Sequence, residues 1–493
     1  MIESNLPALQ VVVPLLAAPF CAMFRKGPGA WFIALAANWA AFAIAVALLL
    51  RVSDGSILSY MMGGWPAPLG IEYRIDIVNA FVLLVVSGIG AVIIPYARLS
   101  IAIEIAEDRQ AWFYTMYLLC LAGLLGVTIT GDAFNIFVFL EISSLSSYVM
   151  IAMGRDRRAL TASYQYLIMG TIGATFIVIG IGLLWTLTGT LNLLDLAQRI
   201  RVIENAPGVL SALAFLAVGI SLKLALFPLH LWLPNAYAYA PSVASAFLAG
   251  TATKVAIYLF LRFFFTVFGG SAWFDASPVA EIFLVLSLAA MFAASTVAIF
   301  QNDVKRMLAY SSVAQIGYIT LGISLASETA LTGSIVHIFN HALMKAGLFL
   351  LVGGIVYRLR LFKIEDLAGI GRKMPLTMAG FTILGLSMLG TPGTVGFIGK
   401  WYLGLAAIEA GYWWLVILIV ASSLLTLVYM GRVVEVAYFR EPSPAVAQLR
   451  EAPLSMLIPA WLLVVGSVWF GFDTEATVGF ASRAAAALVA GVF

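Results

Sequence analysis

Charged residues and cysteine are both scarce in this chain. Lys, Arg, Asp and Glu make up 10% of its 493 residues, against roughly 25% in a typical soluble domain. The two cysteines, Cys21 and Cys120, both stand in apolar runs without a CxxC or Cys/His spacing, so we expect no disulfide and no metal centre. No glycine-rich phosphate loop follows a strand pattern. We therefore expect no cofactor, and nothing in the sequence points to nucleic acid as a partner.

Apolar residues dominate instead. They account for 62% of the chain, and the mean hydropathy is +1.03. Apolar runs of about 20 residues, enough to cross a bilayer, recur from end to end. The first ten residues, MIESNLPALQ, lack the basic region and the cleavage site of a secretory signal. The sequence thus predicts an all-α polytopic membrane protein whose first apolar run is retained as a span.

The runs predict 14 transmembrane helices. Most of the 27 Lys and Arg residues fall in the connections after odd-numbered helices, beginning with Arg25 and Lys26. By the positive-inside rule those connections are cytoplasmic and both termini lie on the extracytoplasmic side of the cell inner (plasma) membrane. The helices are predicted near 6–24, 30–50, 77–97, 111–130, 133–153, 159–187, 208–232, 241–266, 278–300, 307–326, 330–356, 375–404, 412–437 and 453–472.

Five ionisable residues lie deep inside these predicted spans. An ionisable group at the bilayer centre costs about 2.5–3.5 kcal/mol on insertion scales, so it usually marks a functional path. Lysine can lose its proton, whereas arginine stays protonated, and no arginine occupies these positions. We therefore expect a path for protons, with some of these lysines neutral part of the time. The five residues are Glu141, Lys223, Lys254, Lys345 and Lys400.

Two of the predicted spans are interrupted. One contains LKLALFPLHLWLP, with Pro228 and Pro234, and the other contains LGTPGTVGFIGKWY, with Pro392. Proline breaks helical hydrogen bonding, and paired broken helices point to two inverted repeats in a transporter. The sequence thus predicts two inverted five-helix repeats, each containing a broken helix. They would cover 111–266 and 267–437, after helices 1–3 at 1–110 and before helix 14 and the tail at 438–493.

The eleventh predicted helix carries a polar stripe. His337, His341 and Lys345 are spaced four residues apart, which places them near one helical face over about 12 Å. Such a stripe should face a hydrated interior. A plainer interpretation makes the histidines interhelical hydrogen-bond donors and lets Lys345 reach toward the membrane surface. A Lys–Glu pair such as Glu141 and Lys223 could likewise serve packing alone.

Several stretches resemble one known family. With these residues placed, the chain is similar to the antiporter-like subunits of Mrp-type multisubunit cation/proton antiporters, respiratory complex I and membrane-bound hydrogenases. The resemblance covers nearly the whole chain, and the nearest likeness is to the D-type component of the Mrp antiporters. It rests on TGDAFNIFVFLEISSLSSY, LKLALFPLHLWLPNAYAYAPS, GTATKVAIY, DVKRMLAYSSVAQIGY, FNHALMKAGLFL and GTPGTVGFIGK.

The resemblance implies roles for the buried residues. Glu141 would pair with Lys223 of the first broken helix, and Lys254 would continue a hydrated axis toward the eleventh helix. A lysine at 400, where one complex I member carries glutamate, argues against that member. At position 235 this chain has asparagine where many relatives have aspartate. A negative charge that those relatives carry at the entrance of the implied proton path is therefore missing here. In full, the implied proton relay is Glu141, Lys223, Lys254, His337, His341, Lys345 and Lys400.

The sequence therefore predicts a proton-translocating subunit of a multisubunit monovalent cation (Na⁺)/H⁺ antiporter, with other membrane subunits as partners. The chain would not be an enzyme by itself. An alternative places the same proton path in a redox-driven complex of the complex I or hydrogenase type. Two further alternatives are a scaffold subunit without conduction and a carrier of organic anions.

Overall fold

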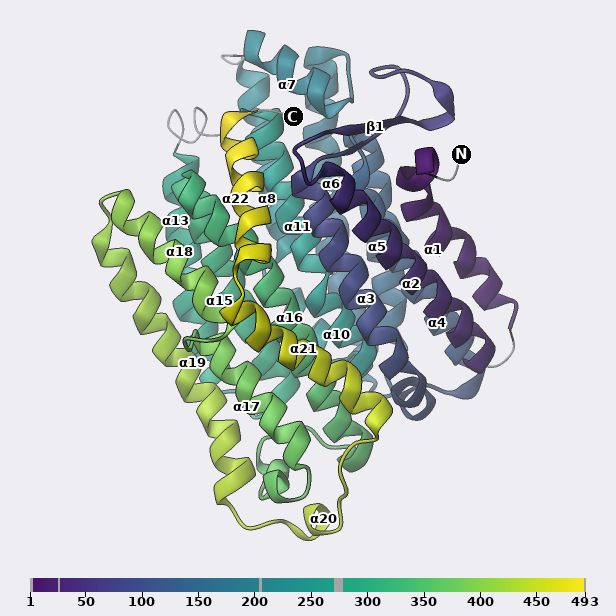
Figure 1. Ribbon diagram of the computed structural model, residues 1–493, viewed down its shortest axis with the longest axis vertical. Coiled ribbons are helices and arrows are strands. Elements are labelled where there is room, and N and C mark those ends of the chain that lie inside the picture. The colour runs from purple at the N-terminus through teal and green to yellow at the C-terminus, as the bar shows by residue number, and fades with distance from the viewer. Residues whose placement is uncertain (1–2, 25–26, 204–205, 270–277, 492–493) are drawn as a thin grey trace.

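The computed structural model describes residues 3–24, 27–203, 206–269 and 278–491 as a helical bundle (Figure 1). Arg25 and Lys26, which contribute to the predicted charge asymmetry, lie outside these ranges. The first half contains α1 (Leu6–Ala22), α2 (Gly27–Val52), α3 (Ile77–Glu104), α4 (Glu107–Ile129), α5 (Ala133–Ala152), α6 (Arg158–Thr188), α7 (Leu193–Val202), α8 (Pro207–Leu224), α9 (Trp232–Tyr239), α10 (Ser242–Gly250) and α11 (Ala252–Leu261). The second half contains α13 (Val279–Ala289), α14 (Ser295–Ile299), α15 (Val304–Leu325), α16 (Glu328–Leu359), α17 (Pro375–Leu389), α18 (Val395–Glu409), α19 (Trp413–Phe439), α20 (Pro444–Ala447), α21 (Leu454–Phe472) and α22 (Glu475–Ala490).

The predicted all-α membrane fold is confirmed. Within the described residues, 13 helical segments are long and apolar enough to cross a membrane. Two of these segments run through a π-helical turn, at Arg262–Val267 after α11 and at Ala290–Ala294 between α13 and α14. The predicted span over 375–404 is divided into α17 and α18, of 15 residues each. Each half alone is too short to cross, so together they make the fourteenth span.

Both predicted helix breaks are present. In the first, α8 ends at Leu224, Ala225 adopts a left-handed conformation (φ 61°), and the indole Nε1 of Trp232 donates to Leu222 O across the gap at 2.9 Å. Trp232 also stacks on Tyr166, with ring centroids 3.9 Å apart. In the second, Gly390 ends α17 with φ 92°. These breaks free backbone carbonyls inside the membrane, where they need polar partners.

A third break was not predicted. The span expected over 241–266 is divided at Thr251, whose φ of −128° and ψ of −57° separate α10 from α11. The sequence offers no proline at this point, and Gly250 is the only local weakness. The consequence is a second source of free carbonyls in the first half of the bundle, three residues before Lys254.

The two halves share a local connection. Asp132 caps α5 and Asp303 caps α15, each accepting a backbone N–H three residues on. Each aspartate also forms an isolated antiparallel bridge with the segment that follows the next long helix, at Asn192 and at Lys363. Asp132 and Asp303 therefore hold matching places as helix caps in the two halves. The inverted relation of the two repeats and their boundaries remain a prediction.

A short hairpin covers one end of the bundle. Strands β1 (Leu58–Met61) and β2 (Glu72–Ile75) pair antiparallel, and Glu72 accepts a 2.9 Å hydrogen bond from Asn192 at the start of α7. Just after β2, Asp76 caps α3 and forms a 2.5 Å ion pair with Arg262. Buried charged residues therefore hold the hairpin and the start of α3 against the helices of the first half.

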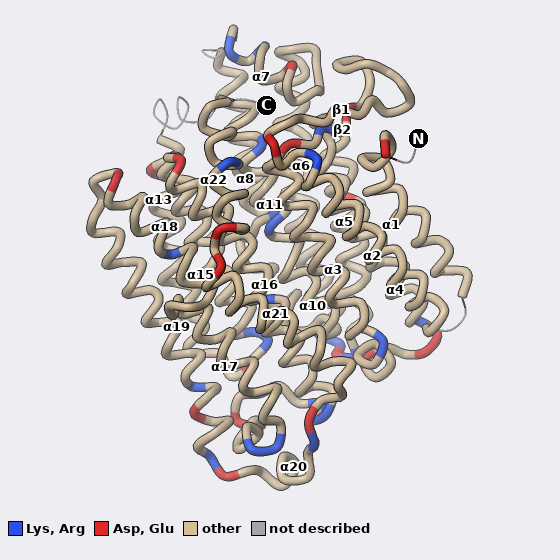
Figure 2. Tube along the Cα trace, viewed as in Figure 1, with Lys and Arg blue, Asp and Glu red and all other residues tan. Residues whose placement is uncertain are grey.

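Charges gather at the two ends of the molecule and are sparse in the band between them (Figure 2). The start of α1 and the end of α22 lie at the same end as the hairpin (Figure 1). This agrees with an even number of crossings, while the predicted sidedness in the cell membrane stays a prediction. The tail after the last predicted span forms α22, which packs on α16 and α3 of its own chain.

Candidate functional site

The first part of the site is the Glu141–Lys223 pair. Lys223 occupies the last turn of α8, at the first break, and its side chain is 4% exposed. Its Nζ lies 3.5 Å from Glu141 Oε1 and donates a shorter bond, 2.8 Å, to Ser144 Oγ one turn further along α5. The Glu141 side chain is 25% exposed. The predicted pair is therefore present but loose, with the serine as the nearer partner.

Lys254 lies in the first turn of α11, beside the third break. It is fully buried, and its Nζ donates to Ala249 O and, at 3.3 Å, to Thr253 Oγ1. The helical discontinuity explains this arrangement, because Ala249 precedes the break and its carbonyl is turned toward the lysine. The neighbouring Gly250 packs on α16, where an added Cβ would lie 3.2 Å from Ala346 Cβ.

The polar stripe of α16 faces the interior, as predicted. His337, His341 and Lys345 are all fully buried. His337 Nε2 lies 2.8 Å from Gln315 Oε1, and Lys345 Nζ donates to Leu308 O at 2.9 Å and to Ser311 Oγ. Neither ring nitrogen of His341 has a hydrogen-bond partner among the described residues. The interpretation of Lys345 as a lysine that reaches the membrane surface is wrong, because α15 encloses its ammonium group.

Lys400 lies at the second break. Its Nζ donates to Met388 O (3.0 Å) and Leu389 O (2.9 Å) at the end of α17, and to Ser423 Oγ (2.8 Å) on α19. The ammonium also sits 4.7 Å from the centre of the Tyr318 ring, which is within cation–π range. The freed carbonyls of the broken helix thus hold this lysine, as those beside the third break hold Lys254.

These groups form a nearly continuous series. The Tyr318 ring that faces Lys400 lies 6.0 Å from the ring of His337, and the His337 and His341 rings are 6.4 Å apart and nearly parallel. Helix α10, which ends at the Lys254 break, packs on α16, and α11 packs on α8, which carries Lys223. The structure therefore brings together the predicted residues around α16 and places the Glu141–Lys223 pair on the next helices. Their roles in a relay stay a prediction.

Residues 130–426, which contain every member of this series, match the model of a protein family described as "NADH:quinone oxidoreductase/Mrp antiporter, TM". The chain belongs to this family. It is 41% identical to the N component of NADH-quinone oxidoreductase from Desulforudis audaxviator over 96% of both chains. It is 30% identical to the D component of the Na⁺/H⁺ antiporter from Alkalihalophilus pseudofirmus over 96% of this chain and 94% of that one.

The fold agrees with this family assignment. A chain in the structure of the Mrp complex from Dietzia sp. DQ12-45-1b superposes with a TM-score of 0.91 at 27% identity, covering 100% of this chain and 98% of that one. Relatives with both antiporter and quinone-oxidoreductase names therefore share this bundle. The chain is accordingly a multi-pass membrane subunit of a proton-translocating family, and its natural partners are other membrane subunits.

Three polar residues of the site were not predicted from the sequence. Gln315 and Tyr318 lie on α15 one turn apart, and both contact His337. Lys305, which the predicted bounds of 307–326 leave in a connection, lies at the start of α15 and is only 3% exposed. The polar spacing in KRMLAYSSVAQIGY held a signal for two of them, since Ser311, Gln315 and Tyr318 recur at steps of four and three residues.

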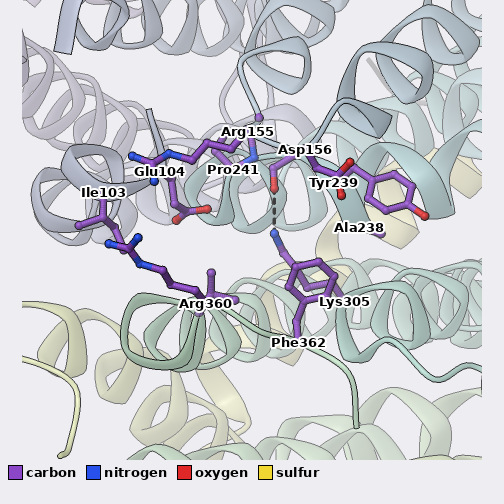
Figure 3. Close-up of a pocket in the computed structure, with 13 residues that line it drawn as sticks. Ile103, Glu104, Arg155, Asp156, Ala238, Tyr239, Pro241, Lys305, Arg360 and Phe362 are labelled. Carbon is purple, nitrogen blue, oxygen red and sulfur yellow. Dashed lines mark hydrogen bonds between the residues drawn. The ribbon is translucent and has the colours of Figure 1, made fainter. Parts of the chain in front are cut away.

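Lys305 opens onto a pocket of about 370 Å³ at the end of the bundle opposite the hairpin. Figure 3 shows Lys305 and Arg360 on one side of this pocket, facing Glu104 and Arg155 on the other. The Lys305 Nζ donates to Ala240 O at 2.8 Å, and Glu104 accepts from the Ser242 N–H at 2.8 Å. The pocket is thus a recess between the two halves of the chain, with charged side chains on both walls.

One wall of this pocket is the loop that contains Asp156, and this loop stays charged at physiological pH. Asp156 forms a 2.5 Å ion pair with Arg158, and the hydrogen bonds from that arginine lower the pKa of the Asp156 carboxyl. Asp156 therefore remains ionised over the whole physiological range. A polar, charged recess of this kind favours water over lipid.

Gly399 allows a close approach of α18 to the histidine stripe. A Cβ at this position would lie 2.5 Å from His337 Nδ1, so Gly399→Val should push the imidazole away from Gln315. We expect this variant to slow proton movement by about tenfold or more, because misplacing a reacting group by about 1 Å can cost up to 10²-fold. Gly404→Val is the matched control, because no atom of the described residues lies within 4 Å of a Cβ at that position of the same helix. Proton flux into vesicles that contain the purified complex measures both variants, and equal fluxes would contradict the placement of His337 in the path.

Proposed function

We propose that this chain moves protons along its buried Glu/Lys/His series as a subunit of a multisubunit monovalent cation (Na⁺)/H⁺ antiporter. The observation that carries the proposal is the series from Lys254 through α16 to Lys400, buried in the middle of the bundle. The presence of Lys400 at the second break and the likeness to the Mrp complex support the antiporter assembly.

The hydrogen-bond partners of the lysines suit proton transfer. In the described part of the chain, Lys254, Lys345 and Lys400 form no ion pair and are held by carbonyl and hydroxyl oxygens alone. A carboxylate partner would hold the ammonium form in place, as Asp76 does for Arg262. Without one, burial favours the neutral amine. Each lysine can therefore accept a proton and release it again.

His341 links the lysines. Its ring nitrogens have no protein partner among the described residues, and a neutral imidazole both accepts and donates a proton. Buried polar groups of this kind are normally satisfied by water. We infer that water enters around His341 and completes the connection from Lys254 and Lys345 toward His337.

The Glu141–Lys223 pair acts as the switch. When the pair is closed, the carboxylate stabilises the charged Lys223. When it opens, that charge is left to interact with the proton on Lys254 across the α8–α11 contact. The 3.5 Å separation and the partial exposure of Glu141 make opening a small movement. A coupled event must drive it, because charge rearrangement shifts an equilibrium only by a difference in interaction free energy.

The polar pocket at Lys305 is the entrance from that side of the membrane. Lys305 and Leu308 lie one turn apart on α15, and the Leu308 carbonyl binds Lys345. A proton taken up at the pocket is thus one helical turn from the central series. Lys305 therefore takes up the proton from the pocket and passes it on to Lys345.

Lys305→Gln should slow proton uptake from the pocket side by about tenfold, because the shorter amide cannot carry the proton inward. Release to the opposite side should be unaffected when the central lysines are already protonated. Arg306→Gln is the matched control at the adjacent, half-buried position. A pH jump applied to one side of oriented vesicles separates the two steps, and identical uptake in Lys305→Gln and wild type would remove Lys305 from the path.

A second assembly is favoured by a specific observation. The relative with 41% identity over 96% of both chains is named as the N component of NADH-quinone oxidoreductase. The same proton path would then work in a redox-driven complex, with electron transfer in other subunits supplying the coupled event. The chain itself would still carry the protons.

The complete complex, purified and placed in vesicles, tests the function and the assembly together. An imposed Na⁺ gradient should drive proton movement that a pH-sensitive dye reports. Proton movement driven by NADH and a quinone, and not by Na⁺, would replace the antiporter with the second assembly. Lys345→Met should reduce the flux by roughly tenfold, since His341 offers a partial bypass. Wild-type flux in that variant would argue for a chain that conducts no protons.

A further inference from the structure

The junction between α21 and α22 carries two carboxylates at an unusual place. Asp473 and Glu475 lie on either side of Thr474, and both side chains are exposed on the surface of the bundle. Neither forms an ion pair or a side-chain hydrogen bond with the described residues. Figure 2 draws this junction in red within the otherwise sparsely charged middle band.

Two contacts fix the depth of this junction in the membrane. An added Cβ at Gly471 would lie 2.5 Å from Thr394 Cα, so α21 ends against the second break, midway along the span formed by α17 and α18. Eight residues after Glu475, Arg483 of α22 donates to the carbonyl of Ser53, just past the end of α2 at the hairpin side. Eight helical residues rise about 12 Å. Glu475 and Asp473 therefore lie near the middle of a hydrocarbon layer of about 30 Å.

Lipid cannot satisfy these groups. A carboxylate at the bilayer centre is costly, and it normally faces a protein partner or a water-filled cavity. No cation of this chain reaches the two carboxylates within the described residues. Something outside the chain must therefore cover them.

The surface that leads to the junction is shaped for a helix. From Ile458 onward, the exposed apolar residues of α21 follow alternating steps of four and three, the spacing of a coiled-coil seam. Phe472, the last of them, is 78% exposed. The five residues of this seam are Ile458, Leu462, Val465, Trp469 and Phe472.

An apolar groove runs beside this seam. It has a volume of about 690 Å³, lies between α21 and Ile383 of α17, and ends at Asp473. The indole Nε1 of Trp461, which lines it, has no hydrogen-bond partner among the described residues. The groove thus offers a large apolar surface and an indole N–H that has no partner among the described residues. A negative charge lies at its end.

We propose that the seam of α21 and the Asp473–Glu475 junction bind a transmembrane helix of another subunit, and that this helix carries a lysine or arginine at mid-membrane depth. The seam supplies the packing surface, at the shallow crossing angle of about 20° that such seams produce. The basic side chain neutralises the carboxylates. This interface does not depend on the proton path, because none of its residues belongs to the relay.

Site-specific photo-crosslinking in the complete complex, in its native membrane, identifies the occupant. A photoreactive phenylalanine analogue at Phe472 should capture a peptide from a transmembrane segment of another subunit, with Lys or Arg within about one turn of the captured residue. The same analogue at the buried Leu463 should give only crosslinks within the chain. Capture of lipid alone at 472, or of a helix without a basic residue, would overturn the proposal.

Charge removal tests the electrostatic part. Asp473→Asn combined with Glu475→Gln should weaken retention of the captured subunit by about 30-fold or more, as expected when a desolvated charge pair loses one side. Glu409→Gln, which removes an exposed carboxylate at the outer end of α18, is the control. Asp473→Lys should release the captured helix, and an aspartate in place of the basic residue on that helix should restore binding. Full retention in the double variant would overturn the charge pairing.

Discussion

Replacing Lys223 with alanine should reduce proton movement by about a hundredfold or more while the complex still assembles. The size follows from the loss of a positioned proton-transfer group, typically 10²–10⁴-fold. Alanine removes both the contact with Glu141 and the 2.8 Å bond to Ser144. The variant then has no positive charge at position 223 that could respond to the opening of the pair with Glu141. Proton flux into vesicles measures the loss, and the subunit composition of the purified complex reports assembly.

Two controls separate charge from proton release. Lys223→Arg keeps a positive charge next to Glu141 but cannot release a proton, so it should assemble normally and remain nearly inactive. Ser221→Ala changes a buried residue of the same helix turn that has no place in the path, and it should conduct like wild type. Normal flux in Lys223→Arg would show that Lys223 acts only as a fixed charge, and normal flux in Lys223→Ala would remove the switch altogether.

Replacing Asp76 with asparagine should destabilise the folded chain by about 3–5 kcal/mol, the usual cost of removing one partner of a buried ion pair. Asp76 Oδ2 holds Arg262 at 2.5 Å, and both side chains are at least nine-tenths buried. Asparagine keeps an acceptor for the cap of α3, where Asp76 Oδ1 binds two backbone N–H groups. The effect therefore measures the loss of the Asp76–Arg262 ion pair more than the loss of the cap.

The combination Asp76→Asn with Arg262→Met should recover most of this stability, because both partners of the buried ion pair are then replaced by neutral residues. Unfolding of the purified protein by titration with a denaturing detergent gives the free energies of the single and double variants. A double variant that is as unstable as the sum of the single variants would show that Arg262 contributes mainly through its bonds to Tyr258 and Thr266.

The sequence was sufficient for the membrane fold, because helix length and hydropathy are local properties. Proline and glycine marked the first and second breaks. The break at Thr251 was missed, because no proline stands there and Gly250 alone does not distinguish a broken helix from a continuous one. The burial of Lys305 was missed for a related reason, since a basic residue next to a loop looks like an orientation signal until the other half of the chain covers it.

Among the predicted site residues, the four-residue spacing on α16 was decisive, since it fixes which side chains share a face. Spacing within one helix says nothing about neighbours on other helices. Gln315 and Tyr318 therefore became visible only in three dimensions, where α15 places them against His337. The exposed carboxylates at 473 and 475 were hidden for the opposite reason, because a predicted tail beyond the last span gave them no depth in the membrane.

The indole of Trp232 bridges the first break and lies flat on Tyr166. Its fluorescence depends on that hydrogen bond and on that stacked ring. Any hinge movement of the broken helix near Lys223 must therefore alter the emission of this one tryptophan. The molecule carries an intrinsic optical probe at the place where the switch would move, and time-resolved emission could follow each opening once the other eleven of the 12 tryptophans are replaced by phenylalanine.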